Sequence, residues 1–165
     1  MKLKKTVQTA LNEQLNREHA ASYLYLAMSG FFEERTYTGF AKWMRDQAQE
    51  EYEHMMKIYR YIFDRGGAVE FKSLDAPTFK DRQLLDVIKY GLDHEKKVSK
   101  YVYELVDLCQ AEKDHATTNF LQWFVEEQVE EEASFSEIEQ QITKIGSNQA
   151  MLYLLDKELG QRKAI

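Results

Sequence analysis

Four segments of the chain repeat apolar residues with alternating steps of three and four, and each repeat is interrupted near its middle by charged residues. This spacing places every repeat on one face of an α-helix. The interrupting residues are Glu18, Glu51 with His54, Glu95 and Glu131. Because helices bury such faces against one another, the pattern predicts an all-α four-helix bundle with a charged site at its centre.

Capping signals and apolar periodicity set the expected boundaries of the elements. Asp81 and Ser147 are candidate N-caps, and Gly66-Gly67 is a candidate stop signal. We expect a single domain over residues 1–165. We expect helices at about 6–34, 38–65, 82–111, 115–145 and 147–159, with a connection over about 66–81.

The lengths of the connections predict the topology. The first connection is very short, so the first two helices are antiparallel neighbours. The second connection has about fifteen residues, which can span about 50 Å when extended. A helix of about 30 residues is about 45 Å long. The second and third helices can therefore run parallel, which is the long-crossover variant of the four-helix bundle.

Two related motifs repeat along the chain. The motif Glu51-x-x-His54 begins 33 residues after Glu18. The motif Gln128-x-x-Glu131 likewise begins 33 residues after Glu95. The two motifs are 77 residues apart. We therefore interpret the chain as two helical hairpins built on one plan.

Burying these carboxylates without a partner would be very costly. An isolated ionised carboxylate in a dry core costs tens of kcal/mol by a Born estimate. The core positions offer no Lys or Arg, and the four glutamates carry four negative charges that two divalent cations would cancel. Oxygen-rich ligands with one imidazole, that of His54, favour Fe(II), Mn(II) or Zn(II). The sequence thus predicts a dinuclear metal site.

Composition excludes several classes of protein. The net charge of −6 and pI near 5.3 argue against nucleic acid as a partner. No apolar run approaches the length of about 18 residues that spans a membrane. We expect no signal peptide, because no apolar segment follows the basic residues at positions 2–5. The lone Cys109 suits a reducing, cytoplasmic location.

Apolar residues outside the core stripes predict association. The short last segment is too short to be a stable helix alone. It either caps the bundle or packs with symmetry copies, and its apolar residues are Met151, Leu152, Leu155 and Leu159. Other apolar residues that we expect to face outward are Tyr23, Leu24, Phe31 and Trp43.

Taken together, the motifs resemble those of the bacterial non-haem ferritins over essentially the whole chain. The residues that carry the resemblance are Glu18 with Tyr25, Glu51-x-x-His54, Glu95 and the segment 123–132. The resemblance implies a ferroxidase with an intrasubunit di-iron centre that uses dioxygen or peroxide. It also implies a homo-oligomeric shell of 24 subunits that stores ferric oxide mineral, and hence a role in iron storage and detoxification.

The resemblance also implies a role for each site residue. The first iron would bind Glu18, Glu51 and His54. The second would bind Glu51, Glu95 and Glu131, with Glu51 bridging. Further positions implied by the resemblance are Gln128 beside the pair, Tyr25 as an electron donor, and Glu50, Glu127 and Glu130 at a third iron site.

Two departures from related families bear on the cofactor and on iron entry. Bacterioferritins place a haem-ligating Met directly after the second-helix Glu, and here that position is Tyr52, so we expect no haem. Animal ferritins line an entry channel with acids where this chain has Thr118 and Leu121. The sequence therefore does not predict the route by which iron enters.

Three alternatives to a ferritin remain to be tested. A di-iron oxidase or peroxidase of the rubrerythrin type typically carries paired Cys-x-x-Cys motifs, and this chain has one Cys. A DNA-protecting miniferritin holds its iron between subunits and does not need ligands on all four helices of one chain. A purely structural bundle needs no central carboxylates and would be as stable or more stable without them.

Overall fold

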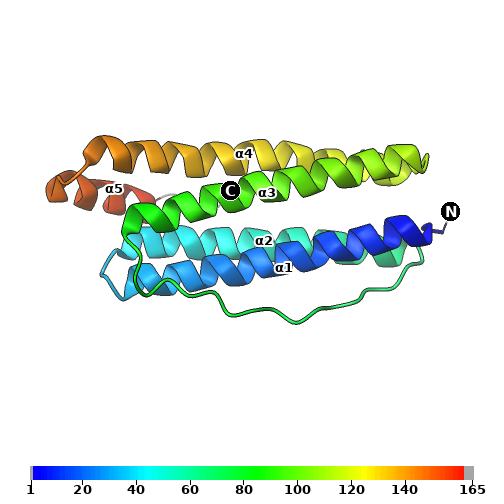
Figure 1. Cartoon of the computed structure of the whole chain (residues 1–165), viewed down its shortest axis with the longest axis horizontal. Helices are drawn as coiled ribbons and strands as arrows, with labels where there is room; N and C mark the ends of the chain where they lie inside the picture. The colour runs from blue at the N-terminus through cyan, green and yellow to red at the C-terminus, as the bar shows by residue number, and fades with distance from the viewer. Residues whose placement is uncertain (1, 162–165) are drawn as a thin grey trace.

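The computed structural model describes residues 2–161, and this part of the chain contains helices and no strands. The helices are α1 (Lys5–Glu33), α2 (Thr38–Asp64), α3 (Leu84–Ala111), α4 (His115–Ile145) and α5 (Gln149–Gln161). The first four form a bundle, and α5 lies across the end where α4 finishes (Figure 1). The predicted fold class, a four-helix bundle with a short fifth helix, is confirmed.

The connection from α2 to α3 runs the length of the bundle along α1 (Figure 1). As a result α2 and α3 are parallel, as the length of this crossover predicts. Two asparagines on α1 hold the crossover at the backbone. The side chain of Asn12 donates to the carbonyl of Ala68 and accepts from the amide of Glu70. Asn16 repeats this pair of bonds one turn later, with the carbonyl of Glu70 and the amide of Lys72.

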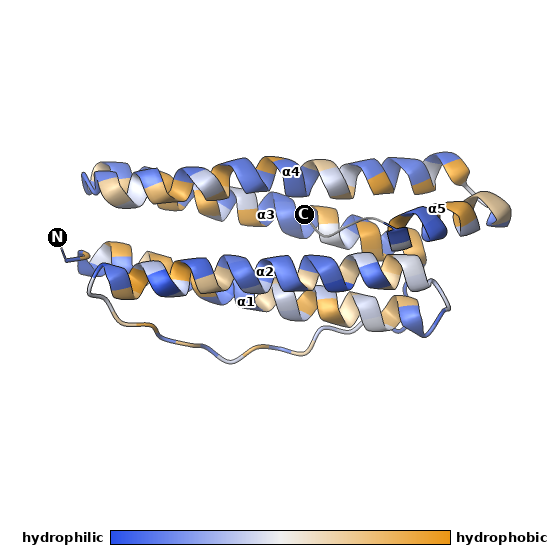
Figure 2. Cartoon of the chain, turned by 180° about the vertical axis from the view of Figure 1, so that it is seen from behind, coloured by the Kyte–Doolittle hydropathy of each residue, from blue (hydrophilic) through white to orange (hydrophobic). Residues whose placement is uncertain are grey.

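The core is divided into two apolar clusters with a polar section between them. One cluster lies at the α1–α2 turn and includes Met28, Phe40 and Phe135. The other lies toward the N-terminus of α1 and includes Leu11 and Phe124. Hydrophobic and hydrophilic residues alternate along every long helix, which is typical of helices with one buried face (Figure 2). The apolar clusters therefore close both ends of the bundle around its charged middle.

The fifth helix caps the second. The first amides of an α-helix lack partners within the helix. In α2 the amides of Gly39 and Phe40 donate to the buried carboxylate of Asp156 on α5, at 2.9 and 3.0 Å. A Cβ atom at Gly39 would lie 1.6 Å from the Asp156 carbonyl oxygen, so only glycine permits this approach.

Two predicted N-caps are wrong by one or two residues. The N-cap of α3 is Gln83 rather than Asp81, because Gln83 and Asp86 form a reciprocal capping box. Before α5 the side chain of Asn148, rather than that of Ser147, accepts from the amide of Met151 at 3.2 Å.

The structure corrects the prediction that four apolar residues face outward. Tyr23 is exposed, but Leu24, Phe31 and Trp43 are buried within the chain. The reason is that the crossover and α4 cover positions that a plain heptad pattern leaves open: the ring of Phe31 meets Phe79 of the crossover, and Trp43 packs on α4. In α5, Leu152, Leu155 and Leu159 are buried, and Met151 is exposed.

No helix within residues 2–161 is both long enough and apolar enough to cross a membrane.

Gly91 on α3 permits close packing beside the polar section. A Cβ atom there would lie 2.3 Å from the ring of Phe135, which is fully buried. We expect Gly91→Ala to destabilise the fold by about 1–3 kcal/mol through overpacking. Denaturant unfolding of the metal-free protein measures this change. The matched control is Gly30→Ala, where no atom lies within 4 Å and the substitution should stabilise the fold by about 0.5–1 kcal/mol.

Candidate metal centre

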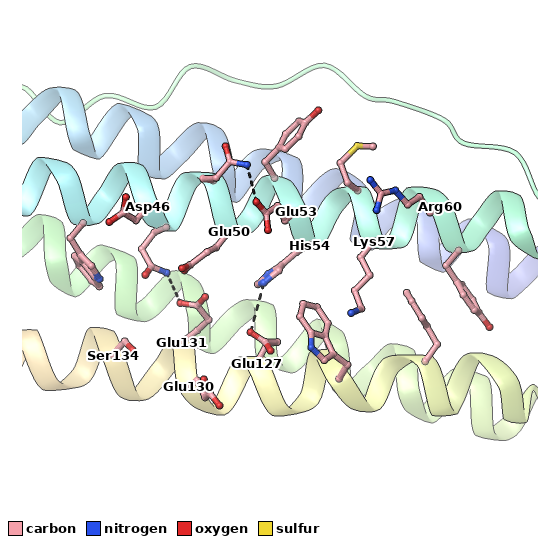
Figure 3. Close-up of a pocket in the computed structure, with 18 of the residues that line it drawn as sticks. Asp46, Glu50, Glu53, His54, Lys57, Arg60, Glu127, Glu130, Glu131 and Ser134 are labelled. Atoms are coloured by element: carbon pink, nitrogen blue, oxygen red, sulfur yellow. Dashed lines mark hydrogen bonds and ion pairs between the residues drawn. The ribbon is translucent and has the colours of Figure 1, made fainter. Parts of the chain in front are cut away.

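A groove between α2 and α4 leads to the polar section of the core. Its volume is about 1050 Å³, and the buried residues His54 and Glu131 reach its wall. Glu50 from α2 faces Glu127 and Glu130 from α4 across it (Figure 3). Glu127 Oε2 lies 3.9 Å from His54 Nε2. The groove is thus acidic where it meets the centre of the bundle.

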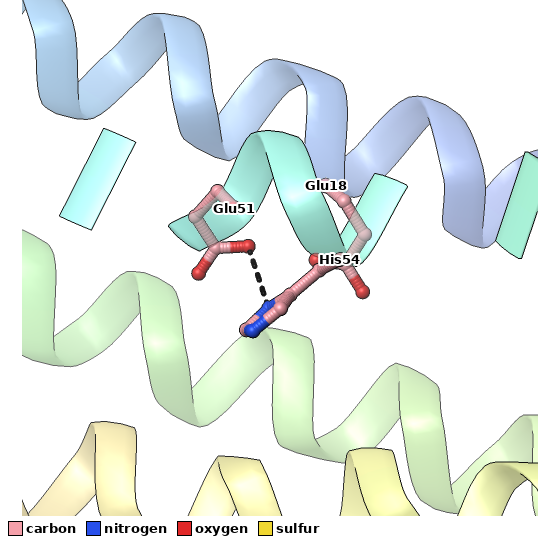
Figure 4. Close-up of side chains that lie close together, drawn as sticks. All are labelled: Glu18, Glu51 and His54. Atoms are coloured by element: carbon pink, nitrogen blue, oxygen red, sulfur yellow. Dashed lines mark ion pairs between the residues drawn. The ribbon is translucent and has the colours of Figure 1, made fainter. Parts of the chain in front are cut away.

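Three side chains from two helices converge inside the bundle. Glu18 comes from α1, while Glu51 and His54 are three residues apart on α2 and therefore share a face. One candidate ligand atom of each lies within 4.8 Å of those of the others, and all three side chains are buried (Figure 4). Within residues 2–161 this is the one set of three acidic, histidine or cysteine side chains that converges so closely.

Two carboxylate oxygens in this cluster lack hydrogen-bond donors. Neither Glu18 Oε2 nor Glu51 Oε2 accepts a hydrogen bond from the described residues, although both atoms are buried. The nearest group to Glu51 Oε2 is His54 Nδ1, at 3.4 Å. Buried polar atoms are nearly always satisfied in folded proteins. Oxygens left open beside an imidazole are the donor set that a divalent transition metal requires.

Glu95 on α3 has partners on both carboxylate oxygens. The Tyr25 hydroxyl donates to Oε1, and the Gln128 amide donates to Oε2 at 3.0 Å. Gln128 also lies 3.3 Å from Ser99 Oγ. The structure thus brings Tyr25, Glu95 and Gln128 together, and the first and last of these orient the Glu95 carboxylate.

Glu131 on α4 is held by a residue of α2. The Gln47 amide donates to Glu131 Oε2 at 2.6 Å, and both side chains are buried. This contact crosses the inner end of the groove between α2 and α4 (Figure 3).

Burial and mutual repulsion raise the pKa values of three carboxyls. Burial raises the pKa of Glu18 well above its usual range, and the charge of Glu51 raises it further. Burial likewise raises the pKa of Glu131, with added repulsion from Glu51 and Glu95. Burial raises the pKa of Glu95 to about 7, although the hydrogen bond from Gln128 opposes this shift. Without a cation, the centre therefore resists holding all its negative charge.

The acidic neighbours of His54 also raise its pKa, which favours the charged form of the imidazole. Burial alone lowers the pKa of this imidazole, but the close approach and negative charge of Glu51 outweigh burial and raise it. The ring also makes an edge-on contact with Trp123, with centroids 5.1 Å apart. This packing fixes the plane of a ring that a metal would bind.

The predicted ligand sets differ in how closely their ligand atoms approach one another in the structure. The ligand atoms of Glu18, Glu51 and His54 converge, whereas those of the second and third predicted sets do not all approach within 4.8 Å. Glu95 and Glu131 are nevertheless electrostatically coupled to the cluster. The assignment of Glu50, Glu127 and Glu130 to a third site stays a prediction.

Sequence reasoning missed three residues at the centre. Gln14 donates to Glu18 and Gln47 to Glu131, and each of these glutamines lies four residues before a core glutamate, a spacing visible in the sequence. The third is His94, which we expected at a surface or interface. Its Nε2 is buried, its ring meets Tyr25 edge-on, and burial lowers its pKa.

Comparisons with known proteins agree with this geometry. The model of the ferritin-like domain family matches residues 8–145. Proteins named bacterial non-heme ferritin are 42% identical over 160 residues in Staphylococcus aureus and in Staphylococcus haemolyticus; the Staphylococcus aureus match covers 97% of this chain and 96% of that protein. Among solved structures, an engineered closed form of Archaeoglobus fulgidus ferritin has a TM-score of 0.96 and 41% identity, with 99% of each chain covered. The open-pore ferritin of the same archaeon has a TM-score of 0.95 and 41% identity, with 98% of each chain covered.

The raised carboxyl pKa values predict an inverted pH dependence for the metal-free protein. The pKa of Glu95 is about 7 in the folded state, whereas its ordinary value, which applies to the unfolded chain, is 4.5. The folded state therefore holds the proton more tightly, and stability falls as pH rises from about 4.5 through 7, by up to about 3 kcal/mol from this group. Thermal unfolding in the presence of a chelator should show a midpoint that falls over this range. Glu95→Gln should flatten the slope, and an unchanged slope would contradict the assignment.

Proposed function

The chain belongs to the ferritin family, and we propose that it oxidises Fe(II) to Fe(III) at its buried carboxylate and histidine centre and stores the product as ferric oxide mineral. The observation that carries this proposal is the convergence of Glu18, Glu51 and His54 in the core, with two carboxylate oxygens left open. Iron is the substrate and the cargo of this activity.

In the proposed arrangement two Fe(II) ions share the centre. The first binds Glu18, Glu51 and His54, and the second binds Glu51, Glu95 and Glu131. The shared role of Glu51 is supported by electrostatics, because its charge raises the pKa of Glu18 on one side and of Glu131 on the other. In both cases the repulsion by Glu51 exceeds that by Glu95, which suits Glu51 to bridge two cations.

Charge explains why such a centre favours oxidation. The four ionised glutamates balance two Fe(II) ions, and the two further positive charges formed on oxidation are stabilised by a carboxylate-rich site. Two Fe(II) ions supply two electrons, which dioxygen or hydrogen peroxide accepts. Tyr25 is hydrogen-bonded to Glu95. In the proposed reaction it would supply a further electron to the oxygen species. Gln128 keeps Glu95 in position from the other side.

The acidic groove gives the product a way out of the bundle. Glu50, Glu127 and Glu130 line the groove, where they form the proposed third iron site. Their oxygens would attract a cation that leaves either of the two metal positions. We propose that iron passes along this wall to the mineral.

The proposed storage compartment is a shell of 24 copies of the chain in the cytoplasm. Its support is the likeness to ferritins over nearly the whole length, together with the apolar side chains that a single chain leaves exposed. These include Leu26, Phe71, Tyr153 and Leu154, which are 54–59% exposed. The proposed shell is free of haem, since Tyr52 stands directly after Glu51 where bacterioferritins have a haem-ligating Met.

Removing a ligand should abolish fast oxidation. We expect Glu18→Ala and His54→Ala each to slow the initial oxidation of two Fe(II) per chain by about 100-fold or more, since loss of even an outer partner of a metal ligand typically costs about 10–100-fold. Stopped-flow absorbance after mixing anaerobic Fe(II) with aerated protein measures this rate. Glu53→Ala is the matched control, because this exposed acid lies in the same segment of α2. Oxidation at the wild-type rate in either ligand variant would refute the assignment.

Storage is tested separately from oxidation. After aerobic addition of a large excess of Fe(II), gel filtration should show iron and protein eluting together as one very large particle. Precipitated iron with a small protein species would instead support a soluble di-iron oxidase of the rubrerythrin type.

A further inference from the structure

We propose that Gln14 and Gln47 are positioning residues that fix the two outermost carboxylates of the metal centre, each for one metal position. This inference rests on the proposed function, because it concerns how the same centre binds its metals. Both side chains are buried, at 0% and 5% exposure, and neither belongs to a predicted ligand set.

Gln14 acts on Glu18. Its Nε2 donates to Glu18 Oε1 at 2.8 Å, from one turn earlier on α1. The orientation of this amide is determined by Arg17, whose Nη1 lies 3.3 Å from Gln14 Oε1. A guanidinium can only donate, so the amide oxygen faces Arg17 and the nitrogen faces Glu18. Arg17 is in turn held over the ring of Tyr101, at 3.8 Å from its centroid.

Gln47 acts on Glu131 from a different helix. Its Nε2 donates to Glu131 Oε2 at 2.6 Å and so joins α2 to α4 at the level of the centre. A metal-binding carboxylate accepts hydrogen bonds and cannot donate them, which requires the amide nitrogen on this side. Gln47 also lines the groove, so the contact stands between the centre and the groove.

Each glutamine occupies one oxygen of its carboxylate and leaves the other for a metal. In Glu18 the oxygen that remains, Oε2, accepts no hydrogen bond from the described residues. Outer partners of this kind orient metal ligands and set their affinity. Held in this way, Glu18 and Glu131 would bind through one oxygen each and keep coordination positions open for the oxidant. Neither glutamine restrains Glu51, which remains free to shift between the two metals.

The test is a titration with Co(II) under anaerobic conditions, which reads binding and geometry without oxidation. Wild-type protein should bind two Co(II) per chain at the buried centre, before any weaker binding at the proposed third site. In Gln14→Met, which keeps the length of the side chain and loses the donor, one of the two sites should weaken by about 10–100-fold. Gln47→Met should weaken the other site by a similar factor. The visible absorption of the affected Co(II) should also lose intensity, because a carboxylate that binds through both oxygens raises the coordination number.

The matched control is Gln141→Met. Gln141 donates to Glu137 at 3.2 Å across the same four-residue separation, but on α4 ten residues beyond Glu131. Both sites of this variant should keep wild-type affinity.

A second variant, Arg17→Met, tests the same role without changing a fully buried residue. Arg17 lies at the edge of the core, so we expect this variant to fold. Removing a positive charge alone would strengthen cation binding. Loss of the contact that orients Gln14 should instead weaken the Glu18 site several-fold. A stronger site in this variant, with wild-type binding in Gln14→Met, would overturn the positioning role. Wild-type protein that binds no Co(II) would overturn the proposed function itself.

Discussion

The structure depends on the cost of burying four carboxylates in the middle of a helical core. Two apolar clusters close the ends of the bundle, and the groove between α2 and α4 leads to the charged section between them. Burial and mutual repulsion raise the pKa values of Glu18, Glu95 and Glu131. Holding all of these carboxylates in their charged form is therefore unfavourable in the metal-free protein. In the proposed function, two divalent cations would neutralise this negative charge, which would favour their binding. The packing at either end therefore serves the chemistry as much as the fold.

Much of the fold and the inner part of the centre could be predicted because they follow from periodicity. A side chain every three or four residues must lie on one face, so the positions of Glu51 and His54 on α2 and of Glu131 on α4 required no tertiary information. The length of the crossover similarly determined the parallel arrangement of α2 and α3. These predictions needed only the geometry of a single helix and the reach of an extended chain.

What the sequence could not provide depends on contacts between distant segments. Phe31 and Trp43 lie off the heptad stripes, yet the crossover and α4 cover them. His94 is half-buried, and its ring packs against Tyr25 of α1, a contact that the sequence did not predict. Gln47 reaches Glu131 across 84 residues of sequence, and its role appears only once α2 and α4 face each other. In each case the partner is chosen by three-dimensional packing and leaves no local signal.

The cap that Asp156 provides to α2 has a consequence for any attempt to shorten or redesign the chain at α5. Helix α5 looks dispensable, because it lies at one end of the four-helix bundle and carries no predicted metal ligand. Yet the first turn of α2 takes its hydrogen-bond acceptor from that helix. If the chain were truncated before α5, the first turn of α2 would lose this acceptor and would fray. Helix α2 is also the helix that carries Glu51 and His54. Redesigning α5 and preserving the candidate metal centre are for this reason a single design problem, unless α2 is first given an acceptor of its own.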